Sequence, residues 1–455
     1  MSTHDAFIAV HRFGLGAAPG DLEDGSPVRR DPRGWLRAQL EDDTPLPRPL
    51  VGLDGAATRV ATFRAAKDKE DRKEIMKGFR EAYADEALRR TLAAAASPQP
   101  FRERLVRLYA DVLTVSITQN KCLGLVGPFE REVIRPHLTG TFPGMLQASC
   151  QHPAMLFYLD NVRSTGPNST AGQRRDSLGR NENLAREVLE LHTMGVSGGY
   201  TQQDVIALAD MLTGWTVAND ADQAAASASG FAFARRRHEP GAQTMLGQTY
   251  PNTGQQQAEA ALNDLARHPA TAKRLAWRMA RHFVADDPSP DVTAPIAQAL
   301  VETGGDLKAA AAAMIDCDAA WAAPMTKIRR PEELVIASMR GLWRPEQLDA
   351  LDEKQSRKLV KALKGMGQMP WSAPSPEGWP DTADDWLDGD ALLRRIRWAE
   401  GLGQRAARRQ VSPQRLAQTI FGADLPEQMA VMVRGAPDRA TGLALVLASP
   451  LFQRR

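Results

Sequence analysis

The chain has 455 residues, which exceeds the size at which one hydrophobic core usually stops growing, so we expect one large domain or a few smaller ones. Hydrophobic residues make up 43% of the chain and charged residues 25%, which is typical of a soluble globular protein. The formal net charge of +2 argues against attraction to nucleic acid or to an anionic membrane driven by overall charge.

Cysteine usage and the N-terminus bear on the cellular compartment. Cys122, Cys150 and Cys317 have no CxxC spacing and leave an odd count, which argues against a disulfide framework or a structural zinc site. The first residues lack the basic start and unbroken apolar core of a signal peptide, and no run of about 18 apolar residues predicts a membrane span. The sequence by itself therefore predicts a cytoplasmic protein.

Apolar side chains recur at three- and four-residue spacing along most of the chain, which predicts a mainly α-helical globular body. The predicted helices are 81–95, 100–113, 128–135, 141–151, 183–194, 202–213, 255–267, 270–284, 293–302, 306–315, 331–342, 354–364, 389–409, 412–419, 425–432 and 437–447. Residues 231–240 and 245–254 are expected to form one minor β-hairpin. We expect a single large helical domain over 1–455, with a division into 1–217 and 231–455 as the alternative.

Three segments are predicted to be loops. Residues 163–180 are rich in Gly, Ser, Asn and Pro, and residues 218–230 are small and polar. Residues 365–388 are rich in proline and carry three tryptophans. Because each indole buries a large area, this last segment is expected to be an ordered loop that wraps over the helical body.

The stretch NENLAREVLELH, residues 181–192, concentrates carboxylates and amides in one predicted helix. On a helical wheel, Asn183, Glu187 and Glu190 share one side, which we call the carboxylate face. His192 falls among aliphatic side chains, nearly opposite Glu190. These two side chains therefore do not ligate one ion as a pair, and His192 is expected to be a core histidine bonded to a backbone carbonyl.

The ends and spacing of this helix predict its local contacts. Glu182, Arg186 and Glu190 recur every four residues, which predicts a ladder of salt bridges. Gly195 is expected to end the helix, and Thr201 with Asp204 predicts a capping box on the next one. The two helices then form an αα-hairpin.

Two interpretations of the carboxylate face stay open. It is either a charged surface in contact with solvent or one wall of a polar cleft. In the cleft, Glu187 and Glu190 would move protons beside Arg186, or Asn183, Glu187, Glu190 and Asp160 would hold a divalent metal ion. No HExxH or HxH spacing supports a zinc site, and HRFGLG at 11–16 is not a phosphate-binding loop.

Several segments of the chain resemble, in the same order, the characteristic segments of one known protein family. The most specific of these segments is residues 181–217. The others are HRFGLGAAPGD (11–21), EREVIRPHLTGTFPGML (130–146), HPAMLFYLDNVRSTGPNS (152–169), RRPEELVIASMRGL (329–342), GQMPWSAPSPEGWPD (367–381) and SPLFQRR (449–455). Together these resemble the bacterial "domain of unknown function 1800" family. One departure is that Ala110–Asp111–Val112 stands where many members have Asn-His-Phe.

The resemblance implies a fold and a partner more than a reaction. In the family a histidine followed by an acid and glycine recurs near His238, so the resemblance makes His238 the histidine expected to complete a site at the carboxylate face. Members often occur beside a sulfatase- or phosphatase-like protein that frequently bears export signals. This implies such a partner and leaves periplasmic export open.

Two functional hypotheses follow, beside a purely structural one in which the polar helix stabilises packing between domains. The first is an enzyme or cation-dependent site built on Glu187 and Glu190, with Arg186, His238, Asn183 and Asp160 as candidate contributors. The alternative is a non-catalytic helical scaffold or interaction module that acts with a sulfatase- or phosphatase-like partner.

Overall fold

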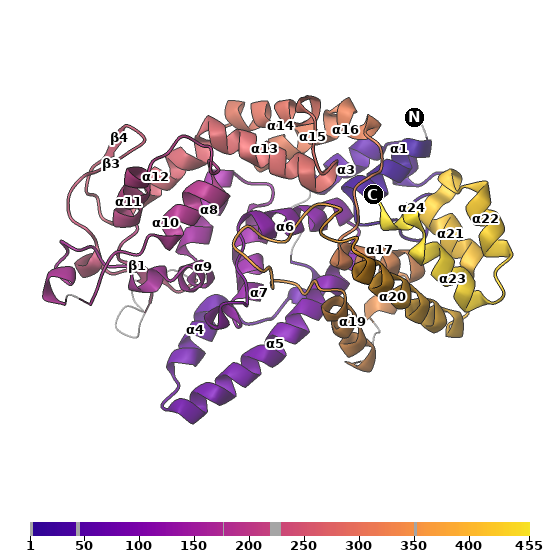
Figure 1. The fold of residues 1–455 in the computed structure, drawn as a ribbon, viewed down its shortest axis with the longest axis horizontal. Helices are drawn as coiled ribbons and strands as arrows, with labels where there is room; N and C mark the ends of the chain where they lie inside the picture. Colours follow the sequence, from indigo (N-terminus) through magenta and orange to yellow (C-terminus); the bar gives the residue numbers. More distant parts are fainter. Residues whose placement is uncertain (1–2, 42–45, 176, 219–228, 350–352) are drawn as a thin grey trace.

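The computed structural model describes residues 3–41, 46–175, 177–218, 229–349 and 353–455. Over these residues the fold is mainly α-helical, as predicted, with two short antiparallel hairpins. Figure 1 shows the helices arranged along one long axis, with the C-terminal helices at one end and both β-hairpins towards the other. None of the described helices is long and apolar enough to cross a membrane.

The α-helices follow one another along the whole chain. The first are α1 (Thr3–Ile8), α2 (Pro27–Arg30), α3 (Pro32–Glu41), α4 (Ala56–Arg64), α5 (Lys69–Ala96), α6 (Pro100–Val112), α7 (Val126–Phe129), α8 (Phe142–Gln151), α9 (Pro153–Tyr158), α10 (Asn183–Glu187) and α11 (Gln202–Met211). The later ones are α12 (Gln255–Arg267), α13 (Pro269–Phe283), α14 (Pro290–Glu302), α15 (Leu307–Asp316), α16 (Asp318–Ala322), α17 (Pro331–Leu342), α18 (Pro345–Asp349), α19 (Glu353–Gly365), α20 (Gly389–Arg408), α21 (Pro413–Phe421), α22 (Glu427–Arg434), α23 (Arg439–Ala448) and α24 (Pro450–Gln453).

Short helical turns of other kinds join these helices. The π-helical turns are η1 (Ala9–Phe13), η4 (Glu130–Ile134) and η8 (Val188–His192). The 3₁₀ turns are η2 (Arg48–Leu50), η3 (Asn120–Cys122), η5 (Arg135–His137), η6 (Asn161–Arg163), η7 (Gly172–Arg174), η10 (Arg235–Arg237) and η11 (Gly422–Asp424).

The strand pairing differs from the single hairpin that the sequence predicts. Strand β1 (Trp215–Val217) pairs with β2 (Phe231–Phe233), and β3 (Gln243–Met245) pairs with β4 (Gln248–Tyr250). The turn between β3 and β4 contains Leu246 and Gly247, both with positive φ, as a two-residue hairpin requires. Residue 246 is not a glycine or asparagine, so the usual turn signal was missing from the sequence.

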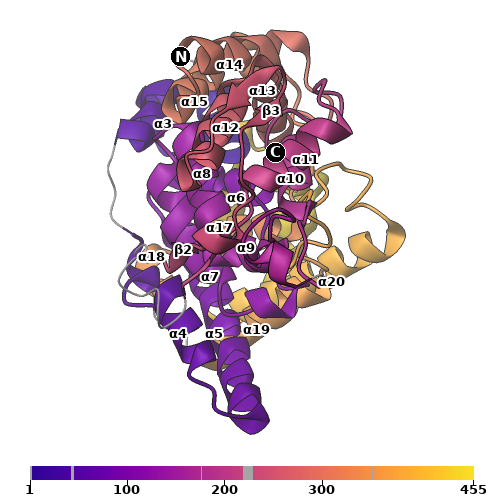
Figure 2. The ribbon, with the colours of Figure 1, turned by 90° about the vertical axis from the view of Figure 1, so that its left-hand side faces the viewer.

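The N-terminal part is more helical than the sequence predicts. Helices α3 and α4 were not predicted, and α5 begins at Lys69 rather than near residue 81, with Asp68 capping its N-terminus. The first half of α5 is largely exposed and strongly charged, so it lacks the apolar periodicity on which the prediction depended. Figure 2 shows α4 and α5 extending together from the body.

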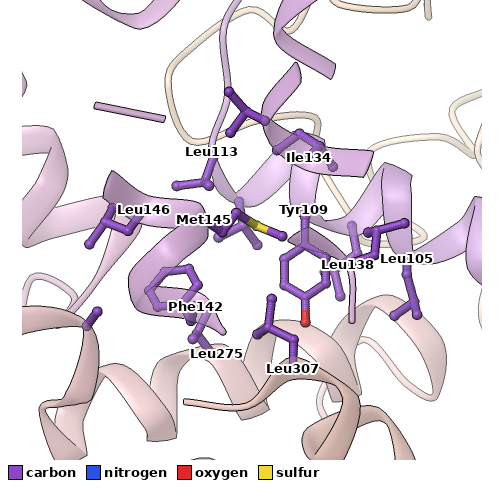
Figure 3. Packing of buried hydrophobic residues seen from close by; sticks show 14 of the residues in the cluster. Leu105, Tyr109, Leu113, Ile134, Leu138, Phe142, Met145, Leu146, Leu275 and Leu307 are labelled. Carbon is purple, nitrogen blue, oxygen red and sulfur yellow. The ribbon is translucent and has the colours of Figure 1, made fainter. Parts of the chain in front are cut away.

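Buried apolar side chains form two clusters. The larger runs from Ala6 to Trp321, and Figure 3 shows part of it, where Tyr109 of α6 lies among aliphatic side chains and Phe142. The smaller cluster is built mainly from α17 and the helices that follow it, together with Leu15, Ala94 and Ala95. The predicted division into 1–217 and 231–455 stays a prediction.

A closed ring of six buried charges lies where the two clusters meet, and we call it the ionic ring. Its members alternate in sign: Arg90, Glu130, Arg135, Glu103, Arg107 and Glu332. The nitrogen–oxygen distances include 2.5 Å between Arg90 and Glu130 and 2.7 Å between Arg135 and Glu103. Each side chain has a partner on both sides, which compensates the cost of removing six charges from water.

Helix α17 extends this polar layer into the smaller cluster. Beside Glu332, Glu333 accepts hydrogen bonds of 2.9 and 3.1 Å from the guanidinium of Arg455, which is fully buried. Arg340 donates to the carbonyl oxygens of Gly16 and Ser97. Gly16 has a φ of +105°, and a Cβ there would lie 2.8 Å from the Cβ of Ala337, so this close approach to α17 requires glycine.

The loop 366–388 is ordered, as predicted, and it covers the ionic ring. The Trp371 indole N–H donates to Glu130 over 3.1 Å, and the Arg90 guanidinium lies 5.3 Å from the centre of the Trp371 ring. Gln368 accepts a hydrogen bond from the Glu332 backbone N–H. Figure 1 shows this orange segment crossing the middle of the molecule.

Breaking the ring should strongly destabilise the protein. We expect Glu130→Ala to lower the free energy of unfolding by about 3–5 kcal/mol, because Arg90 and Arg135 each lose one of their two buried carboxylate partners. Denaturant unfolding followed by circular dichroism measures this. Glu70→Ala, which removes the exposed pair with Lys73, is the control and should change stability by less than about 1 kcal/mol. Equal effects of the two substitutions would contradict the structural role of the ring.

Candidate functional site

The predicted helix over 183–194 is not a regular α-helix throughout. Helix α10 covers Asn183–Glu187, and the chain then widens into the π-helical turn η8, Val188–His192. The Thr193 hydroxyl donates to the carbonyl of Val188 over 2.6 Å, and Gly195, with a φ of +86°, ends the segment as predicted. π-Helical turns are rare, and they occur frequently at functional sites.

The predicted salt-bridge ladder is confirmed. Arg186 lies 3.2 Å from Glu182 and 3.4 Å from Glu190. Gln202 of α11 accepts from Arg186 and donates to Glu182, so the ladder also joins the two helices of the αα-hairpin. All three ladder side chains are between 27% and 40% exposed, which keeps the contribution of each pair to stability small.

Glu187 stands apart from this ladder. It is partly buried, and burial, together with the nearby charge of Glu190, raises its pKa. Its charge in turn is one of the influences that, after burial, raise the pKa of the Tyr158 phenol. The Glu187 carboxyl is thus partly removed from water beside a second carboxylate that disfavours its charged form, and the cleft interpretation stays a prediction.

The other predicted ligands have their own contacts. The Asn183 side chain is exposed. Asp160 has a left-handed backbone with a φ of +54°, and its carboxylate lies 2.9 Å from the amine of Lys121. A shallow hollow of about 940 Å³ adjoins the start of α10, and its lining includes Asn183 but neither Glu187 nor Glu190.

His238 is buried in a different setting. Its Nδ1 lies 3.1 Å from the carbonyl of Thr213, and its ring packs edge-on against Phe233 at 5.2 Å. The following residue, Glu239, accepts two hydrogen bonds from Asn168. These contacts join the segments that flank strands β1 and β2 to residue 168 of the preceding loop. The role of His238 at the carboxylate face stays a prediction. Among the described residues, no group of three or more His, Cys, Asp or Glu side chains is placed to hold a metal ion.

His192 is buried as predicted, but the expected bond to a backbone carbonyl is wrong. The side chain is fully buried, and neither ring nitrogen has a hydrogen-bond partner among the described residues. Burial, and then the charges of Arg274 and Arg278, lower its pKa to about 3. The helical wheel thus predicted the burial of His192 correctly, whereas the carbonyl partner was expected only because buried polar groups are generally hydrogen-bonded.

The motifs that carried the family resemblance have structural contacts. In HRFGLG, Arg12 donates to four backbone carbonyl oxygens after α15, and His11 accepts from Arg329 over 2.7 Å. Asp111, at the position where the sequence departs from the family pattern, lies 2.5 Å from Arg330. The acid is thus part of a buried ion pair beside the ionic ring.

A second candidate site was missed by the sequence analysis. It is an apolar groove of about 860 Å³ between α20, α22, α23 and α24, which we call the C-terminal groove. Its apolar lining includes Ile396, Met429, Met432, Leu445 and Leu451. Leu392, Leu393 and Val431 are further exposed apolar side chains on α20 and α22. Helical periodicity alone did not reveal the groove, because the same pattern predicts a face buried within the protein.

Six large apolar side chains of α20, α22 and α24 are between 36% and 53% exposed: Leu392, Leu393, Ile396, Val431, Met432 and Leu451. Contiguous exposed apolar surface is uncommon on proteins that act alone and often marks a place where another molecule binds. Figure 1 shows α20–α24 at the opposite end of the molecule from α10 and α11. The two candidate sites are therefore separate.

Fold and sites together define a mainly helical protein with a buried ionic layer and an exposed apolar groove. Comparison with known families identifies a match over residues 8–454 to the family described as "Protein of unknown function (DUF1800)". The chain belongs to this family. Comparisons with curated proteins and with solved structures found no match.

Replacing His192 by an apolar side chain should stabilise the protein. We expect His192→Leu to raise the free energy of unfolding by about 1 kcal/mol at neutral pH, because it removes two buried polar atoms without partners. The gain should grow as the pH falls from about 6.5 towards 3, since the native state keeps this ring neutral while the unfolded chain takes up a proton. Denaturant unfolding at several pH values measures this.

His11 is the matched control, because it is also buried with a pKa of about 3. Its two nitrogens do have partners, Arg329 and the carbonyl of Ile420, so His11→Leu should destabilise the protein. A loss of stability in His192→Leu would contradict the absence of favourable contacts at that ring.

Glu187→Gln should also raise the melting temperature at pH 7. The folded protein raises the pKa of Glu187, so the carboxylate is least unfavourable below about pH 4.5 and costs stability as the pH rises through the folded pKa. The melting temperatures of the variant and the wild type should therefore converge in acid. Glu190→Gln, which breaks the pair with Arg186, is the control and should not stabilise the protein. A lower melting temperature for Glu187→Gln at pH 7 would contradict the expectation.

Proposed function

We propose that the protein is a helical interaction module that acts with a partner protein bound in the C-terminal groove. The observation that carries this proposal is the exposed apolar surface of α20, α22 and α24 around the groove. Its apolar lining suits an amphipathic helix, which buries apolar side chains at three- and four-residue spacing. Met429 and Met432 supply adaptable contacts for such a helix.

The family resemblance suggests a sulfatase- or phosphatase-like protein as the partner. Charged side chains are scarce within the groove, Glu400 being the acidic one among its described lining residues. Recognition is therefore expected to depend on apolar contact and only weakly on salt concentration. The ionic ring and the covering loop 366–388 would supply the rigid body on which this surface is presented.

The proposal is tested by co-expressing the protein with the sulfatase- or phosphatase-like partner and measuring complex formation by affinity purification and calorimetry. The variant Ile396→Asp/Met432→Asp should weaken binding at least tenfold, because it places two charges in the apolar contact. Val196→Asp/Val301→Asp changes two exposed apolar residues elsewhere and should leave binding unchanged. Unaltered binding by the groove variant would overturn the proposal, as would the absence of any complex.

A second candidate function is an acid–base or cation-dependent site at the carboxylate face. The raised pKa of Glu187 beside Glu190 favours it, because such perturbed carboxyl groups often mark functional sites. Arg186 would assist proton movement. Asn183, Asp160 and His238 would complete the site only if their side chains moved from the positions described above. Added Mg²⁺, Ca²⁺ or Mn²⁺ should then raise the melting temperature of the wild type but not of Glu187→Gln/Glu190→Gln. Identical melting curves with each metal and with chelator would contradict the cation-dependent form.

A further inference from the structure

A separate pocket of about 260 Å³ lies between α17, α19 and α20. Its apolar lining consists of Met339, Trp343, Leu359, Ala362, Trp398 and Leu402. The α20 residues that line it, such as Trp398 and Leu402, lie on the opposite side of the helix from Ile396 and Glu400 of the C-terminal groove. Pocket and groove are thus distinct surfaces, and we call this one the tryptophan pocket.

The rest of the lining is cationic: Lys358, Arg405, Arg408 and Arg409. None of these four side chains forms an ion pair or hydrogen bond with a residue that the structure describes. No acidic side chain is present among the described lining residues. Four cations thus converge on an apolar pocket without a neutralising group.

This arrangement contrasts with the treatment of arginine elsewhere in the protein. In the ionic ring each arginine contacts two glutamates, and Arg12 binds four carbonyl oxygens. Arg405 has no such partner in the described part of the chain; it is an exposed residue, although the protein atoms around it still lower its pKa. All four cations belong to exposed residues, so a bound anion would reach them from solvent and supply an acceptor that the described lining lacks.

Trp343 provides a second and independent observation. The residue is only 9% exposed, it lines the pocket, and its indole N–H has no hydrogen-bond partner among the described residues. The Arg409 guanidinium lies 5.9 Å from the centre of the Trp343 ring. A buried indole N–H usually finds an acceptor, so this unpaired donor shows that polar contacts beside the pocket are incomplete.

A purely structural explanation accounts for part of this. Arg405 and Arg408 lie in the last turn of α20, where cations interact favourably with the exposed carbonyl end of the helix. It does not account for Lys358, which belongs to α19, nor for the unpaired indole of Trp343. The two tryptophans also supply flat apolar walls that a helix terminus does not need.

We propose that the tryptophan pocket binds a small carboxylate with an apolar body. The carboxylate would accept hydrogen bonds from the guanidinium groups at the rim, while the aliphatic or aromatic body would pack against Trp398, Met339 and Leu402. Arginine matches a carboxylate with two parallel N–H donors, which gives orientation as well as affinity. The inference does not depend on the proposed partner, because it concerns the other face of α20.

Titration of the full-length protein with decanoate and with 2-naphthoate, followed by tryptophan fluorescence and calorimetry, tests this. We expect saturable one-to-one binding of at least one of these probes. Arg405→Gln/Arg409→Gln should weaken it at least tenfold, and Trp398→Ala should weaken it independently. The control Arg434→Gln removes a paired arginine outside the pocket and should bind as the wild type does. Thermal melting of each variant checks that it is folded.

Two comparisons make the outcome decisive. Decan-1-ol has the same apolar chain without the charge, and inorganic phosphate has the charge without the chain. The proposal expects both to bind at least tenfold more weakly than the best carboxylate. Equal binding of decan-1-ol would show an apolar cavity without anion recognition, and equal binding of phosphate would show a simple anion site. Either result, or undiminished binding by the double arginine variant, would overturn the proposal.

Discussion

The fold depends on pairing charges that the helices bring into the interior. Helices α5, α6 and α17 and the turns η4 and η5 each place charged side chains at the boundary between two apolar clusters, where an unpaired charge would cost several kcal/mol. The ionic ring resolves this constraint by closing on itself, and the loop 366–388 covers it. Such a network is sensitive to geometry, so it fixes how the helices meet more than an apolar contact would.

The same constraint separates the candidate sites. Around the ring the charged groups are paired, and opposing arginines overcome the effect of burial on Glu130 to lower its pKa to about 2, which suits a structural carboxylate. At the carboxylate face Glu187 has a raised pKa, and in the tryptophan pocket the cations have no acceptor among the described residues. Among the described residues, Glu187 and the cations of the tryptophan pocket thus lack the close partners of opposite charge that every member of the ring has, whereas the C-terminal groove is defined by apolar side chains.

Helix content and several local motifs were predictable from sequence because they depend on neighbours along the chain. The capping box of Thr201 and Asp204 and the ladder through Arg186 are confirmed in this way. The ionic ring was not predictable, since Arg90 and Glu332 are 242 positions apart in the sequence and come into contact only in the folded protein. The partner expected for His192 was wrong, because the general tendency of buried polar groups to be hydrogen-bonded does not say what surrounds one particular ring. The C-terminal groove beside α20 was not predictable, because an amphipathic pattern does not show whether the apolar face of a helix is covered by another part of the protein.

The central claim is that the ionic ring holds a rigid helical body whose C-terminal groove receives the partner. Hydrogen–deuterium exchange of the free protein and of its complex with the sulfatase- or phosphatase-like partner tests this most directly. The account predicts slow exchange in α6 and α17 in both states, with new protection on binding confined to α20, α22 and α24. Protection that appears instead over residues 181–192, or rapid exchange in α6 and α17 of the free protein, would contradict it.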